Sequence, residues 1–255
     1  MDDSKLSPTE QQLGEVYDAL YASRASVPLV SRLYAIAIGD DYPHEVNTFS
    51  SCDWHLLATM VRELRLGPGR HLVDLGCGTG GVGLWLARAL SARLTGVDVS
   101  SVAVEQAAAR ADHFVPKDRC AFRVGALAST GLPGSSADGV ICVDAFGFAP
   151  DARAAIDEIH RILRPGARAV ITFGGRSPLS SRPWTYQGLE LEAEGPRPDV
   201  AGMWLRLYTL WIERESALRQ QLGDEQAQSM LEEARRRAPG IGKRYFSVVT
   251  LRRTG

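Results

Sequence analysis

The sequence predicts an α/β fold built on a seven-stranded, mostly parallel sheet, with a helical N-terminal lid and a helical insertion before the last strand. The first observation is an alternation between residues 70 and 173, where short β-branched runs take turns with alanine-rich amphipathic stretches. This alternation is typical of parallel strands joined by crossover helices, with ligands bound beyond the carboxyl ends of the strands. The second observation is a G-x-G-x-x-G turn at residues 76–81, directly after the first of these strands.

Composition limits the classes of function. The 255 residues are 45% hydrophobic and 23% charged with a net charge of −1, as in ordinary globular proteins. The chain lacks the basic stripe of nucleic-acid binders and any apolar run of about 18 residues that could cross a membrane. We therefore expect a small-molecule partner, with neither nucleic acid nor membrane as a partner.

Location, redox state and assembly are also constrained by the sequence. The acidic, polar start MDDSKLSPTEQQ is unlike a signal peptide, which predicts a cytoplasmic protein. The four cysteines form no C-x-x-C pair, so we expect reduced thiols rather than a zinc site or disulfides. The sequence leaves the oligomeric state open and is compatible with a homodimer.

Residues 1–69 are predicted to form a helical extension and substrate lid. Apolar residues recur at spacings of three and four in three stretches, at residues 10–21, 30–38 and 51–66. Between the second and third stretches, residues 41–55 (DYPHEVNTFSSCDWH) are dense in polar and aromatic groups. We interpret this segment as a loop over the substrate.

Residues 70–255 are predicted to form the sheet domain. We expect strands near residues 71–75, 94–98, 121–124, 139–143 and 167–173. We expect helices between them at residues 81–90, 101–111 and 151–163.

The C-terminal part carries the predicted insertion. Residues 189–193 alternate leucine and alanine with glutamate, which predicts either an edge strand or a short helix. Two helices are predicted at residues 200–222 and 224–237, and they make up the insertion at about 199–238. The alternation at residues 245–251 predicts a final buried strand.

The glycine turn suits more than one nucleotide. A strand, the glycine turn, a helix and an acid at Asp98 also fit a NAD-dependent oxidoreductase. However, Asp74 lies two residues before Gly76, where its carboxylate would repel a pyrophosphate and attract an ammonium group. The many glycines of residues 76–83 would let the backbone approach a bulky sugar and thioether.

Three segments, DLGCGTG (74–80), GVDVS (96–100) and LRPGARAVIT (163–172), resemble the class I S-adenosylmethionine-dependent methyltransferases. More narrowly, the chain is similar to small-molecule methyltransferases of bacterial specialised metabolism, in which residues 42–45 (YPHE) would belong to a helical lid. The resemblance covers residues 70–173 and implies a Rossmann-like sheet and S-adenosylmethionine as the cofactor.

The resemblance also implies roles for individual residues. The backbone of residues 76–78 would lie along the cofactor, and Asp98 would accept hydrogen bonds from both ribose hydroxyls. Val99 would contact the adenine, and Asp144 would border the methionine moiety. The predicted cofactor-binding residues are Asp74, Gly76, Cys77, Gly78, Asp98, Val99, Ala126, Leu127 and Asp144.

One position departs from the family pattern. After the third strand the family usually has glycine, aspartate and a hydrophobic residue, where this chain has Gly125-Ala126-Leu127. One polar contact to adenine is therefore missing, at a cost of about 0.5 to 1.5 kcal/mol, and backbone groups of Ala126 and Leu127 would supply part of it. The departure keeps open a cyclase or isomerase on the same fold, without methyl transfer.

Two residues of the loop are candidates for catalysis. Methyl transfer from a sulfonium needs an aligned nucleophile and exclusion of water, and a base only where the acceptor holds its proton tightly. His44 and Glu45 are the predicted catalytic pair, and the alternative is a solvated loop. His55 and His160 are interpreted as structural, and His71 and His113 as surface or strand-end groups. Neither of the latter two neighbours another candidate ligand, so no metal site is predicted.

Aromatic residues indicate where the acceptor would bind. Trp204, Tyr208 and Trp211 share one face of a predicted helix, which is typical of packing or, if the helix covers the site, of an apolar cavity. The predicted pocket residues are Tyr42, Trp54, Trp184, Tyr186, Trp204 and Tyr208. The sequence thus predicts methyl transfer to a hydrophobic or aromatic small molecule in natural-product biosynthesis.

Overall fold

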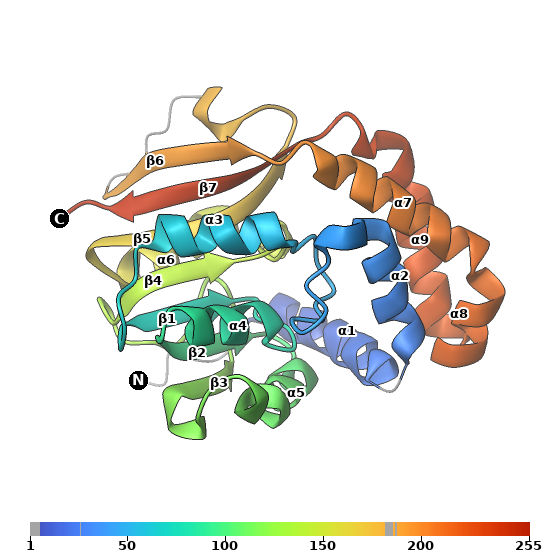
Figure 1. Cartoon of the computed structure of the whole chain (residues 1–255), viewed down its shortest axis with the longest axis horizontal. Helices are drawn as coiled ribbons and strands as arrows, with labels where there is room; N and C mark the ends of the chain where they lie inside the picture. Colours follow the sequence, from blue (N-terminus) through green and yellow to red (C-terminus); the bar gives the residue numbers. More distant parts are fainter. Residues whose placement is uncertain (1–5, 26, 182–185, 187) are drawn as a thin grey trace.

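The computed structural model describes residues 6–25, 27–181, 186 and 188–255. Within these residues, seven strands form one sheet in the order β3-β2-β1-β4-β5-β7-β6 (Figure 1). The strands are β1 (His71–Leu75), β2 (Arg93–Asp98), β3 (Cys120–Val124), β4 (Ala137–Cys142), β5 (Leu163–Gly175), β6 (Leu189–Pro196) and β7 (Tyr245–Arg253). The predicted Rossmann-like α/β fold is confirmed.

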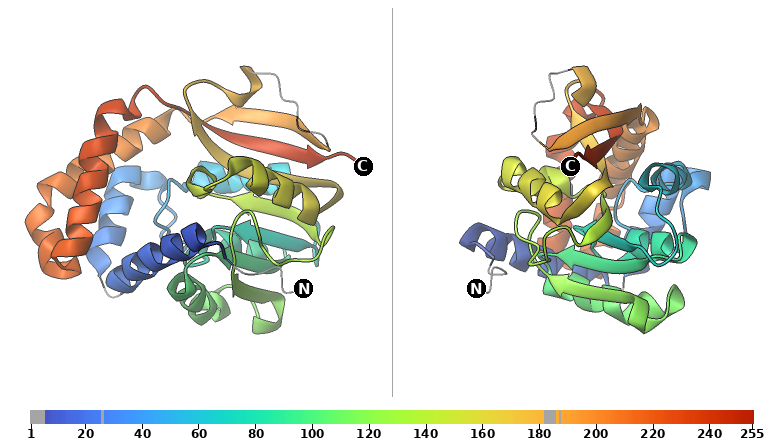
Figure 2. Two further views of the ribbon diagram at one scale, coloured as in Figure 1. Left: turned by 180° about the vertical axis from the view of Figure 1, so that it is seen from behind. Right: turned by 90° about the vertical axis from the view of Figure 1, so that its left-hand side faces the viewer.

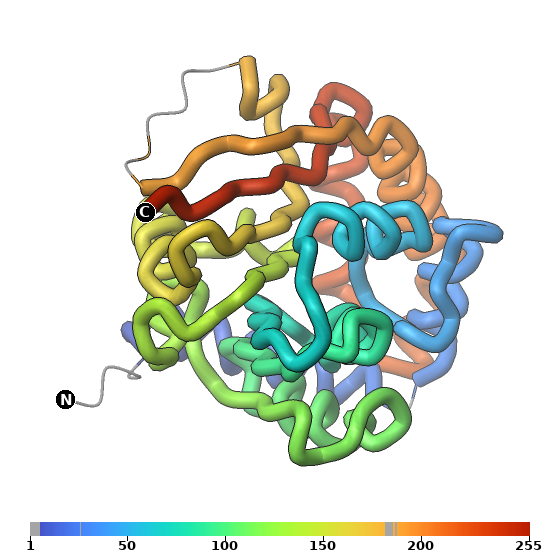
Figure 3. The backbone as a smooth tube through the Cα atoms, turned by 60° about the vertical axis from the view of Figure 1, so that its left-hand side comes forward, coloured from blue at the N-terminus to red at the C-terminus, as the bar shows by residue number. Residues whose placement is uncertain are grey.

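Strand direction divides the sheet into two parts. Strands β1 to β5 are mutually parallel, whereas β7 runs antiparallel to both β5 and β6. Figure 3 traces β6 and β7 side by side along one edge of the molecule. The segment at residues 189–193 is therefore part of an edge strand, and the alternative of a short helix is wrong.

The core follows from the alternation of side chains along the strands. On one face, Leu72, Ile141 and Val170 pack against α3 (Trp54–Leu64) and α4 (Gly81–Ala89). On the other face, Val73, Val140 and Ile171 pack against α6 (Ala152–Ile162). Helix α5 (Ser101–Arg110) covers β2 and β3. The crossover helices thus cover both faces, as the alternating pattern predicts.

The three N-terminal helices pack against different parts of the molecule. Helix α1 (Pro8–Arg24) lies along α5, α2 (Pro28–Ile38) lies along α7, and α3 packs against the sheet. None of the described helices is both long enough and apolar enough to cross a membrane.

The C-terminal insertion differs from the prediction in its helices. The segment at residues 200–222 forms two helices, α7 (Asp199–Glu213) and α8 (Glu215–Leu222), because Arg214 leaves helical geometry with φ −103° and ψ 20°. Helix α9 (Asp224–Ile241) continues past the predicted end, with Pro239 in its last turn.

The helices α1, α2, α7, α8 and α9 gather at one end of the sheet. Figures 1 and 2 show them beyond the carboxyl ends of the parallel strands, where they form a helical cap. A separate apolar cluster packs the helices of the cap against one another. Helices α2 and α7 contribute Leu33, Tyr34, Leu207 and Trp211 to it. The cap is therefore placed over the edge at which open α/β sheets bind ligands.

Candidate functional site

A cavity of about 360 Å³ lies between the carboxyl ends of the strands and the helical cap. Its size is within the range of about 300 to 1,000 Å³ that is usual for small-molecule sites. The predicted cofactor residues that line it are Gly76, Cys77, Gly78, Asp98, Val99, Ala126, Leu127 and Asp144. The structure thus brings these residues together from four separate segments of the chain.

The glycine turn is shaped by contacts that exclude side chains. The N–H groups of Gly76 and Cys77 both donate to the carbonyl oxygen of Val97, at 2.8 and 3.1 Å. Gly76 and Gly78 have φ of 69° and 52°, in the left-handed region. A Cβ on Gly76 would lie 2.2 Å from the Cβ of Ala145, so this position requires glycine.

Asp98 lies at the end of β2 and faces the cavity. Its carboxylate accepts hydrogen bonds from the N–H of Gly78 at 2.8 Å and of Ser100 at 3.0 Å. Burial raises the pKa of this carboxyl, and the two backbone hydrogen bonds counteract the rise. A carboxylate has about four acceptor sites, so acceptor capacity remains for hydroxyl groups of a ligand.

Asp74 does not line the cavity. Its side chain lies beneath the first turn of α4, where a Cβ on Gly83 would be 2.6 Å from its Oδ2. Burial and the neighbouring Asp98 raise the pKa of Asp74 to about 7, although a backbone hydrogen bond from Gly83 opposes the rise. The prediction that this carboxylate faces a ligand ammonium is therefore wrong, because the strand directs it under the helix.

The segment after β3 also differs from the expectation. Ala126 and Ser129 form an antiparallel bridge, in which each N–H donates to the other's carbonyl at 3.1 Å. The N–H of Ala126 is therefore already used. Among the described residues, none accepts a hydrogen bond from the N–H of Leu127, which stays available at the cavity wall.

Helix α1 contributes residues that the sequence analysis did not single out for the site. Tyr17, Tyr21 and Arg24 line the cavity from one face of the helix. Burial raises the pKa of Tyr17 to about 12 and that of Tyr21 well above its usual range, so both hydroxyls stay protonated. The spacing of three and four that predicted the helix was the available signal, but it did not distinguish a core face from a cavity face.

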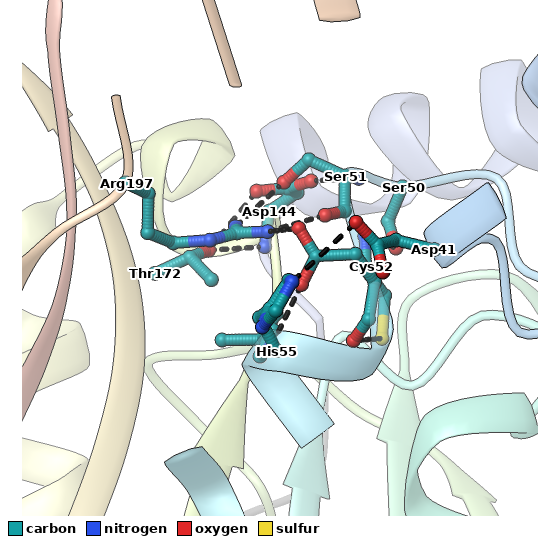
Figure 4. A network of polar contacts seen from close by, with 10 residues as sticks. Asp41, Ser50, Ser51, Cys52, His55, Asp144, Thr172 and Arg197 are labelled. Carbon is teal, nitrogen blue, oxygen red and sulfur yellow. Dashed lines mark hydrogen bonds and ion pairs between the residues drawn. The ribbon is translucent and has the colours of Figure 1, made fainter. Parts of the chain in front are cut away.

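The loop after α2 is fixed over the sheet by a polar network (Figure 4). We call residues 42–53 the strap. The N–H of Ser51 donates to Oδ2 of Asp144 at 2.6 Å, and the hydroxyl of Thr172 donates to Oδ1 of Asp144 at 3.0 Å. The guanidinium of Arg197 bonds the hydroxyl of Ser51 at 2.9 Å and the carboxylate of Asp53 at 3.0 Å.

The predicted catalytic pair lies outside this cavity. His44 is exposed and contacts the ring of Tyr42 edge-on. Glu45 accepts hydrogen bonds from the indole of Trp85 at 2.8 Å and from Arg88 at 2.7 Å. The alternative of a solvated loop describes them better, because ion pairing on the outer side of the strap turns Glu45 away from the cavity.

The predicted pocket residues are placed in different surroundings. Trp204 and Tyr208 line the cavity, and Tyr208 donates to Glu233 at 3.3 Å. Tyr42 is buried and bonds Asn47, and Trp54 packs against Trp85, so neither lines the cavity. Tyr186 lies in a separate surface pocket beside α6, and Trp184 lies outside the described residues.

The arrangement fits the cofactor implied by the resemblance. The glycine turn leaves backbone exposed to the cavity, Asp98 offers acceptor sites, and Leu127 offers a donor. Among the described residues there is no group of three side chains able to hold a metal ion. The cavity then continues between α1, α2, α7 and α9, where aromatic side chains form its wall.

Comparisons with known proteins agree with this arrangement. Residues 72–166 match the family model of a methyltransferase domain. The chain is 25% identical over 201 residues to an O-methyltransferase of Pyrenophora dematioidea, covering 79% of this chain and 69% of that protein. It is 29% identical over 191 residues to the 27-O-demethylrifamycin SV methyltransferase of Amycolatopsis mediterranei (strain S699), covering 74% of this chain and 66% of that protein.

Among solved structures, the [4+2]-cyclase SpnF has a TM-score of 0.75 at 20% identity, over 98% of each chain. This likeness concerns the fold, including the helical cap. The matched stretches span between 58% and 69% of the lengths of three fungal O-methyltransferases.

Proposed function

The chain belongs to the class I S-adenosylmethionine-dependent methyltransferases, and on that premise we propose that it methylates a hydrophobic or aromatic small molecule in natural-product biosynthesis. The observation that carries the proposal is the continuity of the cavity. One end is formed by the glycine turn and Asp98, and the other by aromatic residues of the cap such as Tyr34 and Trp204.

The residues of the glycine end would hold the cofactor. Asp98 would accept the ribose hydroxyls, the backbone of residues 76–78 would follow the methionyl part, and the N–H of Leu127 would donate to the adenine. When bound, S-adenosylmethionine supplies an activated methyl group. The role of the protein is then to align the acceptor and to exclude water from the methyl.

At the other end of the cavity, the cap would both align the acceptor and exclude water. The wall contributed by α2 and α7 includes Tyr34, Trp204 and Tyr208, which offer apolar area to an acceptor. Two carboxylates line this part of the cavity, Asp144 after β4 and Glu233 on α9. Either would take a proton from an acceptor that must lose one.

The reaction is tested by the mass of the product. Candidate acceptors are incubated with the protein and S-adenosylmethionine that carries a deuterated methyl group. We expect the acceptor to gain one labelled methyl while an equal amount of S-adenosylhomocysteine forms. Consumption of acceptor without labelled methyl would overturn the proposal.

A second candidate is a cyclase or isomerase that uses this fold without methyl transfer. It is favoured by the likeness to SpnF along the whole chain and by Ala126 in place of an acid at the adenine end. The same experiment separates the two, because cyclisation leaves the mass of the acceptor unchanged and consumes no cofactor.

A further inference from the structure

Arg24 is a buried cation without an anion. Its residue surface is only 8% exposed, and its Nε has no hydrogen-bond partner among the described residues. Its guanidinium lies over the ring of Phe49 at 5.0 Å, which offsets only part of the cost of removing the charge from water. Its place in the last turn of α1 suits the helix dipole but does not require burial.

The other arginines that line the cavity are already occupied. Arg197 is bonded to Ser51 and Asp53, and Arg237 pairs with Glu233 at 3.3 Å. Arg244 donates to the carbonyl oxygen of Gly174 at 2.8 Å. Arg24 is therefore the cavity arginine, among the described residues, whose side chain forms neither an ion pair nor a hydrogen bond.

A second unsatisfied donor lies in the same wall. The Nε1 of Trp211 is buried without a partner, and Trp211 also lines the cavity. The ring of Tyr34 lies 5.8 Å from the ring of Phe49, over which Arg24 is placed, and 6.4 Å from that of Trp211. Burial raises the pKa of Tyr34, so its hydroxyl stays protonated and can donate.

These three side chains offer donors and no charged acceptor. Guanidinium and indole nitrogens only donate, and a buried donor without a partner is costly. A ligand group with two acceptor oxygens and a negative charge satisfies such a set, and a carboxylate matches the planar fork of an arginine.

We propose that Arg24, Tyr34 and Trp211 form a carboxylate subsite, so that the acceptor is an apolar molecule carrying one acidic group. The inference rests on the proposed function, because it assigns the aromatic end of the cavity to the acceptor. The carboxylate of the cofactor's methionyl part is the other possible source of the same chemistry, and the test separates the two.

The test uses the full chain saturated with S-adenosylhomocysteine, so that the cofactor's carboxylate is already bound. The probes are 3-phenylpropanoate and its uncharged amide, followed by calorimetry or ligand-observed NMR. We expect the acid to bind the wild type about tenfold more tightly than the amide, as a charge-assisted contact implies. Arg24→Met should abolish that preference, and Trp211→Phe, which removes the indole N–H together with part of the ring, should reduce it.

Control variants show whether a loss of acid binding is specific to Arg24. Arg32→Met removes an exposed arginine of α2 and should leave binding of the acid unchanged, and Arg24→Lys should retain part of the preference. Weak or equal binding of acid and amide to the wild type, or acid binding that Arg24→Met leaves intact, overturns the proposal. Loss of S-adenosylhomocysteine affinity in Arg24→Met also overturns it, since Arg24 would then serve the cofactor. Failure of the wild type to bind S-adenosylhomocysteine would instead contradict the proposed function.

Discussion

Asp18 of α1 accepts a hydrogen bond from the hydroxyl of Ser100 at 2.6 Å, across 82 residues of sequence. Ser100 is the N-cap of α5 and accepts a hydrogen bond from the N–H of Ala103 at 3.0 Å. Asp18 also accepts from the N–H of Val102 at 3.0 Å. The carboxylate therefore completes the cap of α5, and it holds α1 beside Asp98 and the cavity.

We predict that Asp18→Ala loosens α1. Loss of a capping carboxylate costs about 1 kcal/mol, so affinity for S-adenosylhomocysteine should fall about threefold to tenfold. Amide hydrogen exchange should accelerate in residues 8–24. Glu15→Ala, an exposed position on the same helix, should change neither measurement, and equal exchange in both variants would show that Asp18 does not hold the helix.

Arg197 should determine how firmly the strap closes the site. Its side chain is 9% exposed and bonds Ser51 and Asp53. Arg197→Met leaves Asp53 without its cation, which should cost about 2 kcal/mol of unfolding free energy and raise hydrogen exchange in residues 42–53. Arg62→Met removes an arginine whose side chain is 71% exposed and serves as the control. Unchanged exchange in the strap would contradict its attachment by Arg197.

Asp74 should make stability depend on pH. Its pKa is raised to about 7, mainly by burial, against an unfolded value of about 3.9. Between these values the folded state binds more protons than the unfolded state, so stability falls as pH rises. Relative to Asp74→Asn, the wild type should lose on the order of 3 kcal/mol between about pH 4 and pH 7. Urea unfolding at several pH values measures this, and parallel curves for the two proteins would refute it.

The sheet was predictable because its pattern is local. Buried parallel strands appear as β-branched runs, and the crossover helices between them as alanine-rich stretches. The predicted bounds of a strand such as β1 therefore match the observed ones at both ends. The break between α7 and α8 was not predictable, because no glycine or proline stands at Arg214. Helical periodicity continues across that residue, so the pattern contains no signal for the break.

The site was predictable where the glycine turn fixes the backbone. It was not predictable where long-range contacts determine the position of a side chain. Residues 76–78 and Asp98 face the cavity because a strand end and a tight turn place them there. The side of the strap on which Glu45 lies depends on Arg88, 43 residues away. The importance of Arg24 depends on its burial beside Phe49, which helical spacing alone does not show.

The central claim is that Asp98 and the glycine turn hold S-adenosylmethionine at the carboxyl end of β2. Calorimetric titration of S-adenosylhomocysteine into the wild type and into Asp98→Ala tests it most directly, with Asp118→Ala, an exposed acid, as the control. We predict one molecule bound per chain, with affinity about tenfold to a hundredfold weaker in Asp98→Ala and unchanged in Asp118→Ala. Binding that is equally tight in Asp98→Ala, or binding of NAD in preference to S-adenosylhomocysteine, would contradict the claim.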